Sequence, residues 1–191
     1  MQVLKNIRSI SRKIRCSNLG KDIPTRKNPR LEGYDYSKGG GFFVTVCTKE
    51  RRNILSEICR GDPCGRPQIK LTELGEVAEK VLKSLEEKYD IILDEYVIMP
   101  DHVHFLIFIK SERATARVAP TLGKIVGAYK SIVANEWRKV CNNRNESCDK
   151  LWQRNYYEHI IRNRQDFEEI KRYIFNNPEK RFFEKAKEDF L

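Results

Sequence analysis

Short runs of β-branched and aromatic residues indicate the strands of this 191-residue chain. They lie at 42–47, 91–99 and 102–110, and their apolar content is typical of buried strands. Only Pro100 and Asp101 separate the second run from the third. Because so short a break joins antiparallel neighbours, these two runs predict a β-hairpin.

Longer stretches place apolar residues three or four positions apart, which is the spacing of one helix face. The clearest helix is predicted at 71–89, with Thr72 as its N-cap, and a second at about 120–140. Two shorter helical pieces are predicted near the C-terminus, at about 155–162 and 166–176. The last of them ends at an Asn-Asn-Pro sequence.

The order of these elements predicts an α+β fold. Its simplest form is a ferredoxin-like sandwich with a central antiparallel sheet and helices on one face. C-terminal helices that carry a candidate nucleophile are expected in addition. One domain is expected over 31–180, with a Gly- and Pro-rich surface insertion at about 60–67. A basic and flexible arm, 1–30, precedes this domain, and a charged tail, 181–191, follows it.

The charge balance narrows the range of partners. The 37 Lys and Arg residues outnumber the 27 Asp and Glu residues, and a formal net charge of +10 favours polyanions such as nucleic acid. Nine of the basic residues lie in the arm, where they suit contacts with phosphates, although a solvated terminus has the same composition. No apolar run approaches the roughly 20 residues of a membrane helix, and no secretory signal is recognisable. A cytoplasmic protein with no membrane partner and with reduced thiols is therefore expected.

Two of the three histidines form the sequence His102-Val103-His104 in the third predicted strand. Side chains two positions apart in a strand point to the same face, so both imidazoles can hold one divalent metal ion. A His-x-His pair alone is a weak signal, because two histidines packed on a polar sheet face give the same pattern.

The third histidine, His159, lies in the predicted helix at 155–162. At about 100° per residue, Tyr156 lies roughly 60° from His159 and shares its face, whereas Tyr157 lies roughly 160° away. This geometry selects Tyr156 as a candidate nucleophile, with Tyr157 as the alternative, and His159 as a third metal ligand. A metal ion stabilises charge on a phosphodiester, and a phenol can attack it to form a covalent intermediate.

Longer motifs make the pattern far more specific. They are Tyr96–His104, Trp152–Arg162 and Tyr173–Pro178, together with Gly33–Tyr36 and Phe43–Thr48. From about Arg30 to Lys180 the chain resembles the REP-associated tyrosine transposases, bacterial relatives of the single-tyrosine HUH insertion-sequence transposases. The resemblance implies a ferredoxin-like fold and an attack by tyrosine on single-stranded DNA, dependent on Mg²⁺ or Mn²⁺. It also implies recognition of palindromic repeats that fold into hairpins.

Carried onto this sequence, the resemblance matches His102 and His104 to paired metal ligands, Tyr156 to the nucleophile and His159 to a further polar ligand. The enzyme would cleave and rejoin DNA through a covalent 5′-phosphotyrosine intermediate, as a monomer or homodimer. Basic residues near the proposed nucleophile would position the strand by its phosphates; they are Arg154, Arg162, Arg164, Lys171 and Arg172. Two other functions stay open: a non-enzymatic hairpin-binding repressor, and a zinc-dependent hydrolase using the three histidines.

Overall fold

The computed structural model describes residues 39–59, 67–110 and 121–188 of the chain. The predicted basic arm and most of the predicted insertion lie outside these ranges. The elements follow one another as β1 (Gly40–Cys47), a short 3-10 helix η1 (Lys49–Arg51), β2 (Ser56–Cys59), β3 (Gln68–Leu71), α2 (Glu73–Tyr89), β4 (Ile91–Met99), β5 (His102–Ile109), α3 (Leu122–Asn143), β6 (Tyr157–Ile161) and α4 (Arg164–Glu188).

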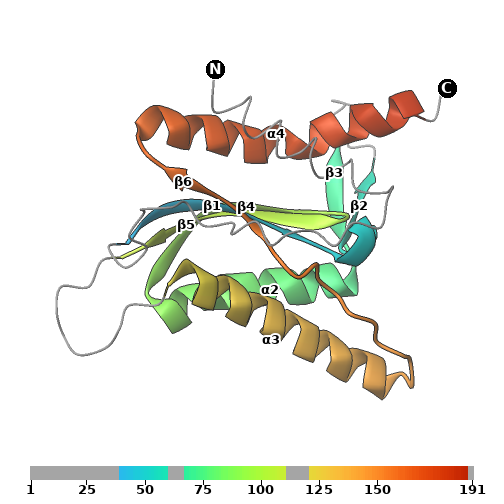
Figure 1. Cartoon of the computed structure of the whole chain (residues 1–191). Coiled ribbons are helices and arrows are strands. Elements are labelled where there is room, and N and C mark those ends of the chain that lie inside the picture. Colours follow the sequence, from blue (N-terminus) through green and yellow to red (C-terminus); the bar gives the residue numbers. More distant parts are fainter. Residues whose placement is uncertain (1–38, 60–66, 111–120, 189–191) are drawn as a thin grey trace, which may run out of the picture.

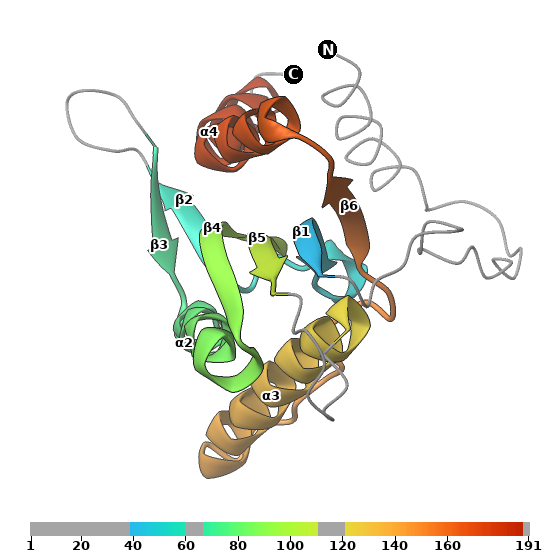
Figure 2. The same cartoon turned by 90° about the vertical axis from the view of Figure 1, so that its left-hand side faces the viewer.

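A four-stranded sheet in the order β4-β5-β1-β6 lies at the centre of the fold, and each neighbouring pair is antiparallel. With α2 between β1 and β4, and α3 between β5 and β6, this order is the ferredoxin-like arrangement. The predicted α+β class is confirmed, as is the β4-β5 hairpin. A separate hairpin, β2-β3, rises from one side of the sheet (Figure 2) and was not predicted.

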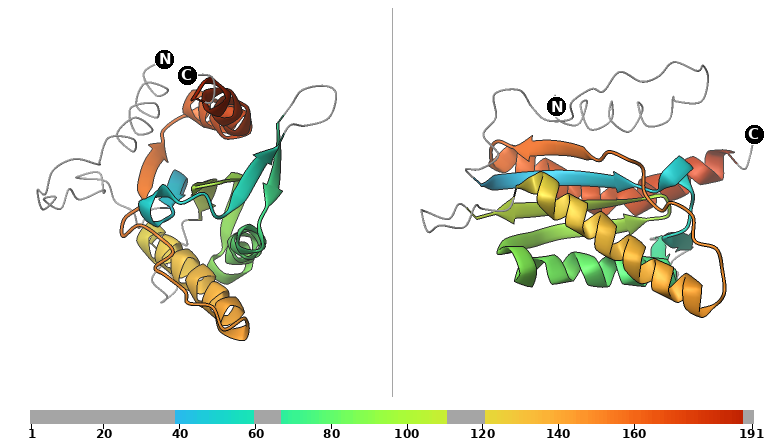
Figure 3. Two further views of the ribbon diagram at one scale, coloured as in Figure 1. Left: turned by 90° about the vertical axis from the view of Figure 1, so that its right-hand side faces the viewer. Right: turned by 60° about the horizontal axis from the view of Figure 1, so that its bottom comes forward.

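Helices cover both faces of the sheet, with α2 and α3 on one side and α4 on the other (Figure 1). Successive side chains of a strand point to opposite faces, which explains why the sheet packs against two separate helical layers. Val103 and Phe105 of β5 point into the core beneath α2 and α3, whereas Leu106 points to the opposite face, where it packs with Ile170 and Ile174 of α4. The predicted layer of helices on one face is confirmed as α2 and α3, and a predicted C-terminal helix, α4, forms a second layer on the other face (Figure 3).

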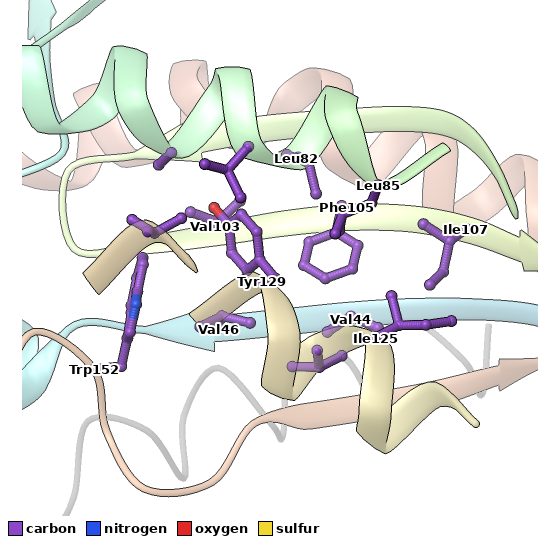
Figure 4. Packing of buried hydrophobic residues seen from close by; sticks show 14 of the residues in the cluster. Val44, Val46, Leu82, Leu85, Val103, Phe105, Ile107, Ile125, Tyr129 and Trp152 are labelled. Atoms are coloured by element: carbon purple, nitrogen blue, oxygen red, sulfur yellow. The ribbon is translucent and has the colours of Figure 1, made fainter. Parts of the chain in front are cut away.

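The larger core lies between the sheet and the α2-α3 layer, and Figure 4 shows its aromatic centre. Phe105 and Tyr129 are fully buried there. Trp152 is also buried, and its indole N–H donates to the Lys130 carbonyl oxygen at 3.1 Å. Each such side chain stabilises the fold by roughly 1.5–3 kcal/mol through its burial.

Thr72 is the N-cap of α2, as predicted, because its side-chain oxygen accepts the backbone N–H of Gly75 at 3.1 Å. Gly75 is required for a different reason. A Cβ at this position would lie 2.0 Å from the backbone carbonyl oxygen of Leu55. The first turn of α2 therefore approaches the chain before β2 too closely for any larger residue.

We expect Gly75→Ala to destabilise the protein by roughly 1–3 kcal/mol, since the overlap is with backbone and α2 must shift. Gly127→Ala is the matched control in α3, where nothing lies within 4 Å of an added Cβ. There alanine should stabilise by about 0.5–1 kcal/mol through its higher helix propensity. Urea unfolding of both variants measures the difference, and equal effects of the two substitutions would contradict the close approach.

Two C-terminal predictions were wrong. The segment predicted as a helix at 155–162 contains strand β6, which pairs with β1. The last helix does not end before Pro178; α4 continues through this proline to Glu188 and includes most of the predicted tail. No helix within the described residues has the length and apolarity needed to cross a membrane.

Candidate active site

The two histidines of β5 lie on the sheet face that α4 covers. His102 is the cross-strand partner of Cys47, and His104 is the partner of Thr45. The imidazoles meet edge to face, with ring centroids 4.4 Å apart and their Nε2 atoms 3.0 Å apart. The structure therefore brings His102 and His104 together as the strand alternation predicts.

The other ring nitrogen of each histidine is held by a neighbour. Asp101 Oδ1 lies 2.7 Å from His102 Nδ1, and Thr45 Oγ1 lies 2.8 Å from His104 Nδ1. Because a carboxylate only accepts, His102 Nδ1 donates to it and His102 Nε2 keeps its lone pair. Burial lowers the pKa of His102 and lowers that of His104 still further, so both rings are neutral at physiological pH.

This geometry fits a divalent cation. Metal–nitrogen bonds of about 2.0–2.1 Å at a right angle place two ligand atoms about 3 Å apart, and the two Nε2 atoms are 3.0 Å apart. Among the described residues, no three His, Cys, Asp or Glu side chains converge on such a point. A further ligand from the described residues would therefore be of another type, such as an amide oxygen.

Helix α4 brings a tyrosine to the same place. The Tyr173 ring centroid lies 5.4 Å from that of His104 and 5.9 Å from that of Phe43 on β1. Ile170 and Ile174 of α4 are buried against the sheet and hold this part of the helix in position. One turn after Tyr173, on the same side of α4, Asn177 is almost fully buried and offers an amide.

Positive charge surrounds the Asp101 end of the site. Arg51 Nη1 donates to Asp101 Oδ2 at 2.9 Å and lies 3.3 Å from His102 Nδ1. Burial would raise the pKa of the Asp101 carboxyl, but the hydrogen bond from His102 and the charges of Arg51 and Arg181 lower it to about 2. Asp101 is therefore ionised and orients the His102 ring, as carboxylates beside metal-binding histidines do.

Comparison with known sequences identifies a family. Residues 42–177 match the family described as Transposase IS200 like. The chain belongs to this family. It is 32% identical over 172 residues to an uncharacterized protein of Haemophilus influenzae, covering 82% of this chain and 89% of that protein. It is 24% identical over 157 residues to the REP-associated tyrosine transposase of Escherichia coli, covering 81% and 76% of the two chains.

Solved structures show the same fold. The IS200-like chain is similar to a REP-associated tyrosine transposase bound to a REP hairpin, with a TM-score of 0.54 and 19% identity. The likeness covers 80% of this chain and 74% of the other. The predicted resemblance to REP-associated tyrosine transposases is thereby confirmed, and the family is one of DNA-cleaving enzymes.

Within this family member, Tyr156 does not lie where the helical geometry predicted. Because Tyr157 begins strand β6 and Tyr156 directly precedes it in extended chain, the two tyrosines point to opposite faces. Tyr156 packs against the core on the α2-α3 side, away from the histidines. Tyr157 lies on the histidine face, where Thr45 separates it from His104 in the cross-strand row.

His159 shares the sheet face of His102 and His104, but the structure does not bring it to them. Its partner on β1 is Phe43, two residues before Thr45, and its own strand β6 lies two strands away from β5. His159 Nε2 instead lies 2.9 Å and 3.0 Å from the two carboxylate oxygens of Asp166 on α4. The predicted role of His159 as a third ligand assumed a helix, and that assumption was wrong.

The predicted DNA-binding residues do not form one patch. Arg154 precedes β6, while Arg162 and Arg164 lie at its other end, and all three are exposed. Lys171 of α4 forms an ion pair with Asp94 of β4 at 2.7 Å. The exposed Arg172 donates from Nε to the Glu168 carbonyl oxygen. Their proposed gathering around Tyr156 is therefore not observed.

Asp166 connects β6 to the helix that carries Tyr173. Its carboxylate accepts from His159 and from the backbone N–H of Arg162 at 3.1 Å, and its own N–H donates to Asn163 Oδ1 at 2.9 Å.

We expect Asp166→Ala to destabilise the protein by roughly 2–3 kcal/mol, because buried donors lose a charged partner. The matched control is Glu168→Ala at an exposed position of α4, expected within about 0.5 kcal/mol. Denaturant unfolding measures the stability of both variants. If Asp166→Ala left the free energy of unfolding unchanged, this connection would not be a support of α4.

Proposed function

We propose that this IS200-like transposase cuts and rejoins single-stranded DNA at hairpin-forming repeats, with the phenol of Tyr173 as its nucleophile. The observation that supports the proposal most directly is the position of Tyr173. Its ring lies beside His104 on the sheet face where the two histidines converge. Neither Tyr156 nor Tyr157 has such a contact with the histidine pair.

The reaction requires a covalent exchange at one phosphodiester. The phenol oxygen of Tyr173 attacks phosphorus and forms a phosphotyrosine bond to the 5′ side, while the bond from phosphorus to the 3′ oxygen breaks. The phenol proton passes to solvent, and the departing 3′ oxygen takes up a proton. Because the phosphoester energy stays in the tyrosine bond, a 3′-hydroxyl can reverse the step and rejoin DNA without ATP.

A divalent cation, Mg²⁺ or Mn²⁺, would be held by His102 and His104, with the amide of Asn177 as a further oxygen ligand. When bound, it would stabilise negative charge on the scissile phosphate and favour ionisation of a nearby phenol. The protein residues around it have defined tasks. Asp101 and Thr45 hold the Nδ1 sides of the rings, and α4 holds the phenol against His104.

Hairpin DNA is the proposed partner for two reasons. The similar structure of a REP-associated tyrosine transposase is bound to a REP hairpin. The net charge of +10 favours a polyanion. Phosphate contacts supply affinity, while the hairpin provides a shape that an unstructured strand lacks.

Adduct capture tests the proposal. The protein is incubated with labelled hairpin oligonucleotides that carry randomised single-stranded flanks, with Mg²⁺, Mn²⁺ or chelator, and is run on a denaturing gel. A metal-dependent covalent protein–DNA band is the expected result. Cleaved DNA without an adduct would instead support the zinc-dependent hydrolase, and bound but uncut DNA would support the repressor.

Trypsin can locate the attached nucleotide, because the candidate tyrosines fall in different peptides. Cleavage after Arg172 and Lys180 isolates Tyr173 in its own peptide, whereas Tyr156 and Tyr157 share the peptide 155–162. Mass spectrometry of the captured adduct should find the added phosphonucleotide on the Tyr173 peptide. A modified 155–162 peptide would overturn the assignment of the nucleophile.

A further inference from the structure

The backbone that positions Arg51 is strained. Glu50 and Arg51 have φ values of 57° and 56°, in the left-handed region that non-glycine residues seldom occupy. The turn is held by Thr48, whose N–H and hydroxyl both donate to the Asp101 carbonyl oxygen at 3.0 Å. The consequence is a largely buried guanidinium fixed beside Asp101 and His102.

The guanidinium of Arg51 is not fully used by these contacts. Its Nη1 contacts Asp101 and His102, but its buried Nε–H has no hydrogen-bond partner within the described part of the chain. A guanidinium has five N–H groups in a planar fork, which suits two oxygens of one anion. The Nε itself is out of reach of a ligand, but 24% of the side chain is exposed, so Arg51 can offer its outer N–H groups to a further ligand at this end of the site.

Arg181 approaches the same place from α4. Helix phase puts Ile170, Ile174, Asn177 and Arg181 within an arc of about 60°, so Arg181 continues the face that packs on the sheet. Its charge acts on both Asp101 and His102. Within the described residues no carboxylate forms an ion pair with Arg181, and Asp101 forms its ion pair with Arg51. The site has surplus positive charge at this end.

We propose that Arg51 and Arg181 together bind a phosphodiester group of the DNA, next to the one that Tyr173 attacks. This inference rests on the proposed function, which brings a DNA strand to Tyr173. Arg181 lies eight residues after Tyr173, about 12 Å along the helix, too far to share the scissile phosphate but suitable for a neighbouring one. By holding that neighbour, the two arginines fix which phosphate of a flexible strand faces the phenol.

The test measures DNA binding without cleavage. Hairpin oligonucleotides with the flank recovered from captured adducts, or with a random flank, are bound to the Tyr173→Phe protein in chelator, with and without Arg181→Ala. Arg181→Ala should weaken binding about 10- to 100-fold, as expected for loss of a charge-assisted hydrogen-bonded contact. It should also reduce the log–log salt slope by about 0.7. Lys180→Ala removes an exposed neighbouring charge and should change affinity less than threefold.

A methylphosphonate scan separates a phosphate contact from a structural role. Each phosphate near the cleavage position is replaced in turn by an uncharged methylphosphonate. At one position beside the scissile phosphate, the penalty of Arg181→Ala should disappear, because the charge that it binds is already absent. An equal penalty at every position, or an equal effect of Lys180→Ala, would overturn the proposal. Failure of adduct formation would refute the cleavage chemistry, whereas the affinity and the salt slope of Arg181→Ala can still be measured on a hairpin with a random flank, so the two failures can be distinguished.

Discussion

Replacing Tyr173 by phenylalanine should abolish the covalent protein–DNA adduct while hairpin binding stays within a few-fold of the unchanged protein. The substitution deletes one oxygen and keeps the ring that packs against His104 and Phe43. Loss of a nucleophile costs several orders of magnitude in rate, whereas its apolar contacts persist. Quantitative adduct gels and fluorescence anisotropy measure the two effects on one protein preparation.

Tyr156→Phe and Tyr157→Phe are matched controls, because each removes the same single oxygen from a neighbouring element. Tyr156 packs into the opposite core, so its variant should form adducts at close to the normal rate. Tyr157 is partly exposed on the histidine face, and its variant should keep most activity. If Tyr156→Phe lost the adduct and Tyr173→Phe kept it, the position of Tyr173 beside His104 would have no catalytic meaning.

The histidine pair could be predicted from sequence because it depends on local geometry alone. Two residues separated by one in a strand share a face whatever the strand pairs with. The β4-β5 hairpin was equally local, since Pro100 and Asp101 leave room only for a tight connection. Thr72 as the N-cap of α2 follows from a single side chain and its own helix.

Strand β6 was mispredicted because its sequence satisfies two periods. Tyr156, Tyr157, Ile160 and Ile161 have the three- and four-residue spacing of a helix face, yet five residues are short enough for a strand. Pairing with β1 decides between them, and this contact lies more than 100 residues away in sequence. The choice of Tyr156 as nucleophile relied on helical phase, so the wrong secondary structure also gave a wrong position for this residue in the site.

Tyr173 was not selected because the sequence does not show which helix covers the histidine face. Its motif, Tyr173–Pro178, carries part of the resemblance to the transposases. A signal was present: Ile170 and Ile174 mark one buried helix face, and Tyr173 and Asn177 lie beside them. Only the packing of α4 on Phe43 and Leu106 connects that face to β5.

The three histidines should differ sharply when they are replaced one at a time. His102→Ala and His104→Ala should each remove detectable adduct formation even at millimolar Mg²⁺, because each deletes one Nε2 of the converging pair. His159→Gln should keep activity within a few-fold, since His159 contacts Asp166 and the glutamine amide retains a donor for that carboxylate. Adduct yield across an Mg²⁺ titration measures all three.

Asp101→Asn gives a graded test of the same arrangement. It leaves both Nε2 atoms but replaces the carboxylate that accepts from His102 Nδ1. The Mg²⁺ concentration for half-maximal adduct should rise about 10- to 100-fold, as is usual when such a partner is lost. Thermal unfolding should show that the variants remain folded, with chelator changing the unfolding temperature little, because the helices and the sheet are held together by apolar contacts that need no cation. If His159→Gln were as inactive as His104→Ala, His159 would have to be a metal ligand after all. If chelator unfolded the protein, the metal site would be structural, as in a zinc domain.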